Sequence, residues 1–205
     1  MHDGGDPTVL REGLLQRATP SLAYGFGSAL VVVSALLTGC ASLPDTLDAG
    51  PVKNGFELVG RVAVRHGREG MNGRIVWRHG SDFDEMLITS VLGQGIARIT
   101  RRRGSVELVT ADQSRYKASE AESLTERILG WRLPLAGLPD WVQGRADPAY
   151  PARVARDARS RLRELEQNGW GIEYQEYEGA RPLMLRMSRD NIEIRLIVDE
   201  WTAPQ

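Results

Sequence analysis

The sequence predicts an α+β fold of about ten antiparallel strands with a helical insertion near the middle. Three observations predict it. Apolar and polar residues alternate in short segments from residue 56 onward, tight-turn residues separate these segments, and a segment of helical pattern begins near residue 119. Alternation with a period of two is typical of strands that bury one face. Strands at near-regular spacing indicate a meander, in a barrel or a curved sheet.

The first six predicted strands follow one another directly. The first covers residues 56–65, where Phe56, Leu58, Val62 and Val64 fall on one face and charged residues on the other. The other five are expected at 71–78, 83–90, 96–100, 106–110 and 115–118. Each gap between them is short and contains Gly, Asp or Ser, the residues that favour tight turns. A meander of neighbouring strands is therefore expected for this half of the chain.

A helix is expected after the sixth strand. Ser119 and Glu122 have the spacing of a capping box, with Ser119 as the N-cap residue. Leu124 and Ile128 lie on one helical face, and Gly130 is a typical helix stop. The segment that follows, 131–144, is apolar and interrupted by prolines. It predicts a second short helix, which either begins with Asp140 as its cap or holds Pro139 in its first turn.

The segment 152–166 is ambiguous. Its composition favours a helix, but its apolar stripe is thin, with only Leu162 and Leu165 in its second half. Asn168 and Gly169, which follow it, form a strong type I′ hairpin signal. If that hairpin forms, the residues just before it are a strand. A last hairpin, 182–188 and 192–201, ends the predicted sheet.

The N-terminal part is typical of a secretory signal. A basic start precedes an uncharged, strongly apolar segment that ends in Leu37-Thr38-Gly39-Cys40. These four residues resemble the bacterial lipobox, in which the Cys thiol accepts a diacylglyceryl group before cleavage. A transmembrane helix or a Cys placed there by chance are the alternatives. We expect a signal peptide at 1–39, a lipidated tether at 40–55 and one domain at 56–205.

The residues of known catalytic and metal-binding motifs are largely missing. Cys40 is the one cysteine, which excludes an internal disulfide and a zinc site with two thiolates. His66 and His79 lie beside glycines and are expected in exposed turns. Arg101, Arg102 and Arg103 are expected at a solvated hairpin tip rather than at a lipid or nucleic-acid surface. The net charge of −1 argues against a nucleic-acid binder. We expect no enzyme, no metal and no cofactor.

Several segments, in order, resemble the LolB family of outer-membrane lipoproteins. They are "FELVGRVAVR", "GRIVWRH", "SVLGQGIARI", "RYKASEAESL", "LPLAGLPDWVQG", "LEQNGWGIEY" and "IRLIVDEW", and together they span 56–201. Val91 stands where the family's loop has Pro. The resemblance implies an incomplete antiparallel half-barrel of about ten or eleven strands. Helices would cover its concave side and an apolar cavity. It also implies a hairpin over 160–177.

The resemblance also implies a function. Such a protein accepts triacylated lipoproteins from a periplasmic, LolA-like carrier and releases them into the outer membrane without nucleotide. We expect a monomer that is lipid-anchored at Cys40 and faces the periplasm. Ala41, rather than Asp, after the lipobox agrees with the outer membrane. The alternatives are a structural or assembly lipoprotein, and a lipid-modifying enzyme. The latter would need a nucleophile beside a base, which the spacing does not suggest.

Two sets of candidate residues follow from this resemblance. Val91 and Leu92 are large and apolar beside Gly93, and we expect them to form a membrane-insertion loop, although a bulged strand that buries Leu92 is the alternative. The second set is apolar and would line the acyl-chain cavity, although a packed core has the same composition. Its members are Leu58, Val62, Val64, Ile75, Trp77, Met86, Ile88, Leu124, Ile128, Trp131 and Leu133.

Overall fold

The structure is a computed structural model that describes residue 52 and residues 54–202. The predicted signal peptide, lipobox and most of the tether lie outside the described residues. All described residues belong to a compact unit, Ala41–Gln205, which contains the whole sheet, both helices and the core. Among the described residues, no helix has the length and apolarity needed to cross a membrane.

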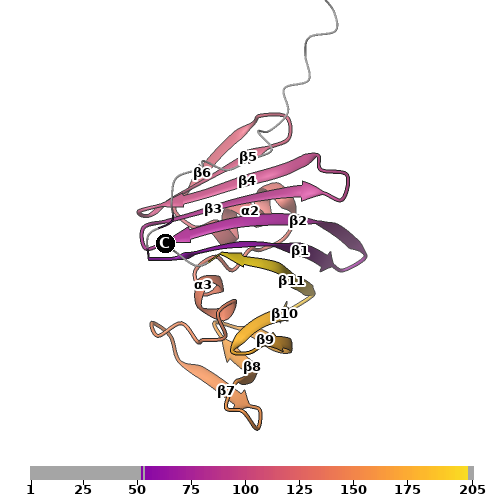
Figure 1. The fold of residues 1–205 in the computed structure, drawn as a ribbon. Coiled ribbons are helices and arrows are strands. Elements are labelled where there is room, and N and C mark those ends of the chain that lie inside the picture. Colours follow the sequence, from indigo (N-terminus) through magenta and orange to yellow (C-terminus); the bar gives the residue numbers. More distant parts are fainter. Residues whose placement is uncertain (1–51, 53, 203–205) are drawn as a thin grey trace, which may run out of the picture. The chain divides into compact units, whose positions relative to one another are not determined.

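One open antiparallel sheet dominates the unit, as Figure 1 shows. Its first six strands are β1 (Phe56–His66), β2 (Glu69–Gly80), β3 (Phe83–Ser90), β4 (Gly95–Arg102), β5 (Ser105–Thr110) and β6 (Arg115–Ala118). Its other five are β7 (Ala152–Arg156), β8 (Leu162–Gln167), β9 (Trp170–Glu178), β10 (Arg181–Arg189) and β11 (Ile192–Thr202). The spatial order is β6-β5-β4-β3-β2-β1-β11-β10-β9-β8-β7. The sheet is not closed, so the predicted α+β half-barrel of about ten or eleven strands is confirmed.

The helical insertion connects β6, at one edge of the sheet, to β7, at the other. It contains α2 (Ala121–Leu129) and α3 (Leu138–Trp141). Gly130 ends α2 with a left-handed backbone, φ 80°, as predicted. Pro139 lies in the first turn of α3, which confirms that alternative over a cap by Asp140. A chain that crosses from edge to edge must pass over one face of the sheet, and this face becomes the inner face.

The predicted capping box is wrong. Glu120, not Ser119, is the N-cap residue of α2, and no side chain caps the helix. Ser119 comes directly after the end of β6 and is still part of the turn into the helix. Ser123 instead donates its hydroxyl to the carbonyl of Glu120, at 3.3 Å.

The segment 152–166 is a pair of strands, β7 and β8, and the helix that its composition favours does not form. Asn168 and Gly169 both have positive φ, 52° and 75°, as a type I′ turn requires. Leu162 and Leu165 are almost completely buried on the sheet. The turn and this burial outweigh the helical propensity, which is a weak preference of a few tenths of a kcal/mol per residue.

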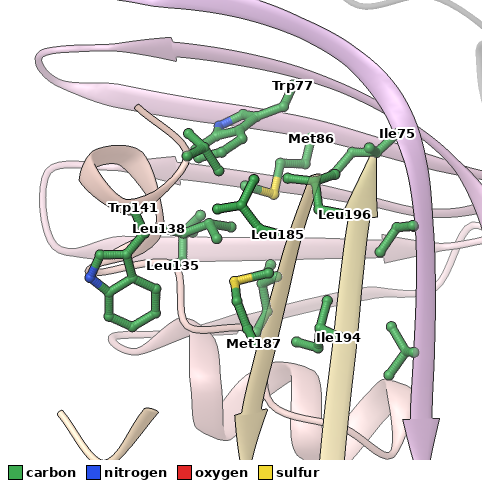
Figure 2. Close-up of a cluster of buried hydrophobic side chains, with 14 of the residues drawn as sticks. Ile75, Trp77, Met86, Leu135, Leu138, Trp141, Leu185, Met187, Ile194 and Leu196 are labelled. Atoms are coloured by element: carbon green, nitrogen blue, oxygen red, sulfur yellow. The ribbon is translucent and has the colours of Figure 1, made fainter. Parts of the chain in front are cut away.

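The core lies between the inner face of the sheet and the insertion. Leu135, Leu138 and Trp141 come from the insertion, and Leu185 and Met187 come from the sheet. Figure 2 shows these side chains gathered in one cluster, and all of them are buried. The insertion thus fills the inner face with apolar side chains.

Candidate functional site

The loop between β3 and β4 carries the most exposed large apolar side chains of the described residues. Leu92 is 85% exposed and Val91 is 71% exposed. The bulged strand that would bury Leu92 is therefore not what the structure shows. Leu92 stands in the solvent although its transfer into an apolar surrounding would gain about 1.5–3 kcal/mol.

Backbone hydrogen bonds close this loop on itself. The amide of Ser90 donates to the carbonyl of Gln94 at 2.8 Å, and that of Gly93 donates to the carbonyl of Ser90 at 2.9 Å. The Ser90 hydroxyl oxygen also accepts the amides of Leu92 and Gln94, at 3.3 and 3.2 Å. The loop is therefore a preformed turn, and Leu92 can be buried elsewhere without a further cost for ordering the backbone.

The candidate cavity residues come together on the inner face. They are Leu58, Val62, Val64, Ile75, Trp77, Met86, Ile88, Leu124, Trp131 and Leu133, all of them buried, with Ile128 half-buried beside them. They come from β1, β2, β3, α2 and the segment after α2. In this structure their side chains pack against one another and against the insertion. The inner face is an apolar surface that the insertion covers.

A small hollow of about 110 Å³ opens where α2 meets the turn between β1 and β2. Val64, Met71, Leu129 and Trp131 supply its apolar walls, and His66 lies at its side. The indole N–H of Trp131 is buried and has no hydrogen-bond partner among the described residues. Sites for drug-sized ligands are usually 300–1,000 Å³. The hollow therefore marks an opening under α2 and has no room for an acyl chain.

Few polar contacts hold α2 to the sheet. Glu122 pairs with Arg189 of β10 at 3.2 Å, and both side chains are partly exposed, 34% and 28%. Exposed ion pairs contribute about 0–1 kcal/mol. Within the insertion, the buried hydroxyl of Thr125 accepts the amide of Leu133 at 2.9 Å and donates to the carbonyl of Ala121. In its polar contacts, the α2 segment is thus tied to itself more firmly than to the sheet, while Leu124 attaches it to the core by apolar packing.

Buried hydrogen bonds hold α3 much more firmly. The side-chain oxygen of Gln167 accepts the indole N–H of Trp141 at 2.8 Å and the amide of Asp147 at 2.9 Å. Its amide nitrogen donates to the carbonyls of Asp147 and Tyr150, at 2.8 and 2.9 Å. Tyr174 donates its hydroxyl to the carbonyl of Trp141 at 3.0 Å. Burial raises the pKa of Tyr174 far above its usual value, so this hydroxyl keeps its proton.

Replacement of Gln167 tests this attachment. Gln167→Leu should lower the free energy of unfolding by about 2–4 kcal/mol, because it leaves buried donors and acceptors without partners. Gln143→Leu is the control, since Gln143 is half-buried, donates to the carbonyl of Pro139 and accepts one exposed hydrogen bond from Arg145. This change should cost about 1 kcal/mol or less. Urea unfolding of both variants measures the difference. Equal losses would show that the bonds of Gln167 do not set the stability of this region.

A polar cluster that the sequence did not predict lies at the other end of the sheet from the 91–94 loop. Asp84 is fully buried and accepts the indole N–H of Trp77 at 3.0 Å. A ring nitrogen of His79 lies 2.8 Å from the same carboxylate, and Arg101 donates its Nε to the other oxygen at 2.5 Å.

This cluster corrects two predictions. His79 is a half-buried strand residue and not an exposed turn residue, and Arg101 belongs to the cluster and not to a solvated tip. Arg103 does lie in an exposed turn, with a side chain that is 85% exposed. Alternation places Asp84 on the inner face. The sequence does not show which residues bind its carboxylate, because they lie on neighbouring strands. The described residues contain no group of three or more His, Cys, Asp or Glu arranged to hold a metal ion.

Comparison with known proteins gives one consistent family. Residues 54–201 match the model of the family described as outer membrane lipoprotein LolB. The outer-membrane lipoprotein LolB of Thiobacillus denitrificans is 40% identical, over 85% of this chain and 97% of its own. The LolB of Pseudomonas aeruginosa is 35% identical, over 83% and 93%. A solved LolA superfamily protein from Nitrosomonas europaea aligns with 73% of this chain over 86% of its own length, at 11% identity. The TM-score of this alignment is 0.47.

Proposed function

The chain belongs to the LolB family, and from this premise we propose that it accepts triacylated lipoproteins from a LolA-like carrier and releases them into the outer membrane. The family assignment rests on a match over nearly all described residues. The curated relatives carry the name of an outer-membrane lipoprotein. We extend to this chain their location, with a lipid anchor at Cys40 and a domain that faces the periplasm. Cys40 itself lies outside the described residues.

The exposed Leu92 is the observation that carries the proposal. A monomeric domain gains nothing from holding Leu and Val at the tip of a preformed turn, since exposed apolar side chains are tolerated rather than useful. A membrane would provide an apolar environment for both side chains. Inserted together, they would contribute about 3–6 kcal/mol, which is enough for contact with the bilayer but too little to hold the domain there permanently. Release of a substrate requires such reversible contact.

The inner face would shield the acyl chains of the substrate. Each buried CH₂ contributes about 0.8 kcal/mol, so a chain of ordinary length gains on the order of 10 kcal/mol. Two observations support entry under α2: the hollow beside Trp131 opens there, and the ion pair between Glu122 and Arg189 that ties α2 to the sheet is partly exposed. The buried Gln167 network would keep α3 in place meanwhile. Apolar burial is non-directional, so transfer needs neither nucleotide nor catalysis.

The packed inner face favours one alternative, a structural or assembly lipoprotein that never takes up lipid. All but one of the candidate cavity residues are buried in this structure. The two functions differ in whether α2 can move away from the sheet. A protein with a permanent core would keep these side chains packed in the presence of acyl chains.

A transfer experiment separates the two. The domain 41–205, without its anchor, is mixed with a periplasmic carrier that is loaded with a triacylated lipoprotein, and the lipoprotein is followed by pull-down of each protein. We expect it to move to the domain. A folded domain that receives no lipoprotein and binds no fluorescent fatty acid would contradict the proposal and support the structural function.

A further inference from the structure

We propose that a basic groove on the outer face binds the phosphate headgroups of anionic lipids while Leu92 contacts the membrane. This inference rests on the proposed membrane role of the 91–94 loop. The groove has a volume of about 380 Å³, and Arg65, Arg68 and Arg195 line it together with Asn72.

The basic groove lies at the same end of the sheet as Leu92. Its residues come from the end of β1, the turn into β2, the start of β2 and the start of β11. Antiparallel pairing places those positions beside the end of β3, where the 91–94 loop begins. Gly73, next to Asn72, pairs with Ser90 in β3. The amide of Gly67 donates to the carbonyl of Asn191 at 3.2 Å, which joins the turn before β2 to the turn before β11.

The charges of the basic groove are only partly neutralised. Arg65 pairs with Glu193 at 3.3 Å, yet 68% of its side chain remains exposed. Arg68 and Arg195 are exposed and have no ion pair with a described residue. With Glu69 and Glu193 as the two acids of the lining, the three arginines leave one excess positive charge.

The register of the strands places like charges opposite each other. Arg195 faces Arg186 across β10 and β11, and Arg74 faces Arg61 across β1 and β2. Arg186 and Arg61 have carboxylate partners, Glu173 at 3.7 Å and Asp199 at 2.7 Å, whereas Arg195 has no ion pair with a described residue. Opposed like charges in an antiparallel pair are destabilising. An anion in the basic groove would offset the charge of Arg195.

Phosphate is the anion that suits these side chains. A guanidinium group donates two parallel hydrogen bonds to phosphate oxygens, and the amide of Asn72 adds a further donor. The basic groove lies at the same end of the sheet as Leu92, and this position indicates that the phosphate belongs to a lipid headgroup. Insertion of the loop tip brings this end of the sheet to the bilayer surface, where the electrostatic attraction acts over a Debye length of about 8–10 Å. The partner is therefore the anionic lipid of the membrane that Leu92 enters.

Vesicle binding by the domain 41–205 tests this. This unit contains all the described elements and the whole core. Co-flotation compares vesicles of phosphatidylcholine with vesicles that also contain phosphatidylglycerol. We expect the variant Arg68→Gln/Arg195→Gln to bind the anionic vesicles roughly 25-fold more weakly, about fivefold for each arginine. Its binding to neutral vesicles should not change, and salt near 1 M should remove the preference of the parent domain.

The matched control is Arg103→Gln/Arg153→Gln, which makes the same change in net charge. These two side chains are 85% and 89% exposed and belong to other parts of the sheet. Thermal unfolding checks that both double variants keep the parent's stability. Equal loss of binding in the two double variants would overturn the proposal, because it would show an effect of net charge alone. Unchanged vesicle binding by Arg68→Gln/Arg195→Gln, with slower uptake of lipoprotein from the carrier, would also overturn it in favour of a protein-docking surface.

The Leu92→Glu variant separates this inference from the proposed function. If the loop is the membrane tip, this variant loses binding to neutral and anionic vesicles alike. If Leu92→Glu binds as the parent does while Arg68→Gln/Arg195→Gln loses anionic binding, the basic groove stands and the membrane role of the loop fails.

Discussion

Leu92→Glu should reduce delivery of a lipoprotein to the membrane by roughly thirtyfold or more while the domain unfolds at an unchanged temperature. The change removes about 2–3 kcal/mol of apolar burial in the bilayer and adds a charge at the point of contact. It removes nothing from the folded domain, since Leu92 is 85% exposed and its loop is closed by backbone bonds and Ser90. Delivery is measured as the fraction of a labelled lipoprotein recovered with vesicles, and stability by thermal unfolding.

Gln94→Glu is the matched control, because it places the same charge two residues away without removing an apolar group. Gln94 takes part in the loop through its backbone, so the turn should persist. Delivery close to that of the parent is expected for Gln94→Glu, and also for Leu92→Met. Similar losses in Leu92→Glu and Gln94→Glu would mean that charge, not the lost leucine, impairs delivery. A large drop in unfolding temperature for Leu92→Glu would mean that the side chain is buried in solution.

Local patterns were sufficient to predict most of the sheet. The strand at 83–90 was predicted with the bounds that the structure has, because turn residues bound it on both sides. Segment 152–166 was the difficult part. Its arginines and alanines favour a helix, and β7 has only Val154 as a large apolar side chain, which is 47% exposed. Pairing with β8 decides its structure, and pairing partners cannot be read from a strand's own residues.

The candidate site was predictable to different degrees. The exposure of Leu92 was anticipated from the resemblance to the LolB family, whereas the residues alone left open a bulged strand that buries it. The inner-face residues could be identified from alternation, but a cavity and a packed core require the same side chains. The basic groove was not predicted, because it depends on register: Arg195 and Arg65 are far apart in the sequence and meet only through the pairing of β1 with β11.

Asp84→Ala should lower the free energy of unfolding of the domain by about 2–4 kcal/mol. Asp84 lies in a row across three strands, between His79 of β2 and Arg101 of β4. Its carboxylate is fully buried and is the acceptor for the indole of Trp77 and for Arg101. Asp84→Ala leaves the buried indole N–H of Trp77 without its acceptor, whereas Arg101, whose side chain is 35% exposed, stays partly solvated. For a domain of this size we expect a fall in unfolding temperature of roughly 10 °C.

The same hairpin supplies the matched control. Asp82 pairs with Arg103 at 3.5 Å, but these side chains are 67% and 85% exposed. Asp82→Ala should therefore cost about 0–1 kcal/mol, the usual range for a surface pair. Denaturant unfolding measures the free energy of unfolding of the two variants and so compares the same substitution at a buried and at an exposed site. Equal, small losses would show that water reaches Asp84 and that the cluster is not a buried network.

A double-mutant cycle then separates the ion pair from the other bonds of the cluster. Arg101→Met leaves the carboxylate of Asp84 with Trp77 and His79 as partners, and the double variant Asp84→Ala/Arg101→Met should be less destabilised than the sum of its two single changes. Because the cluster is at the opposite end of the sheet from Leu92, its variants should deliver lipoproteins in proportion to the fraction that is folded. Leu92→Glu should do the reverse and lose delivery with no loss of fold. We therefore expect changes in the Asp84 cluster and in the 91–94 loop, at opposite ends of β3, to affect stability and membrane contact separately.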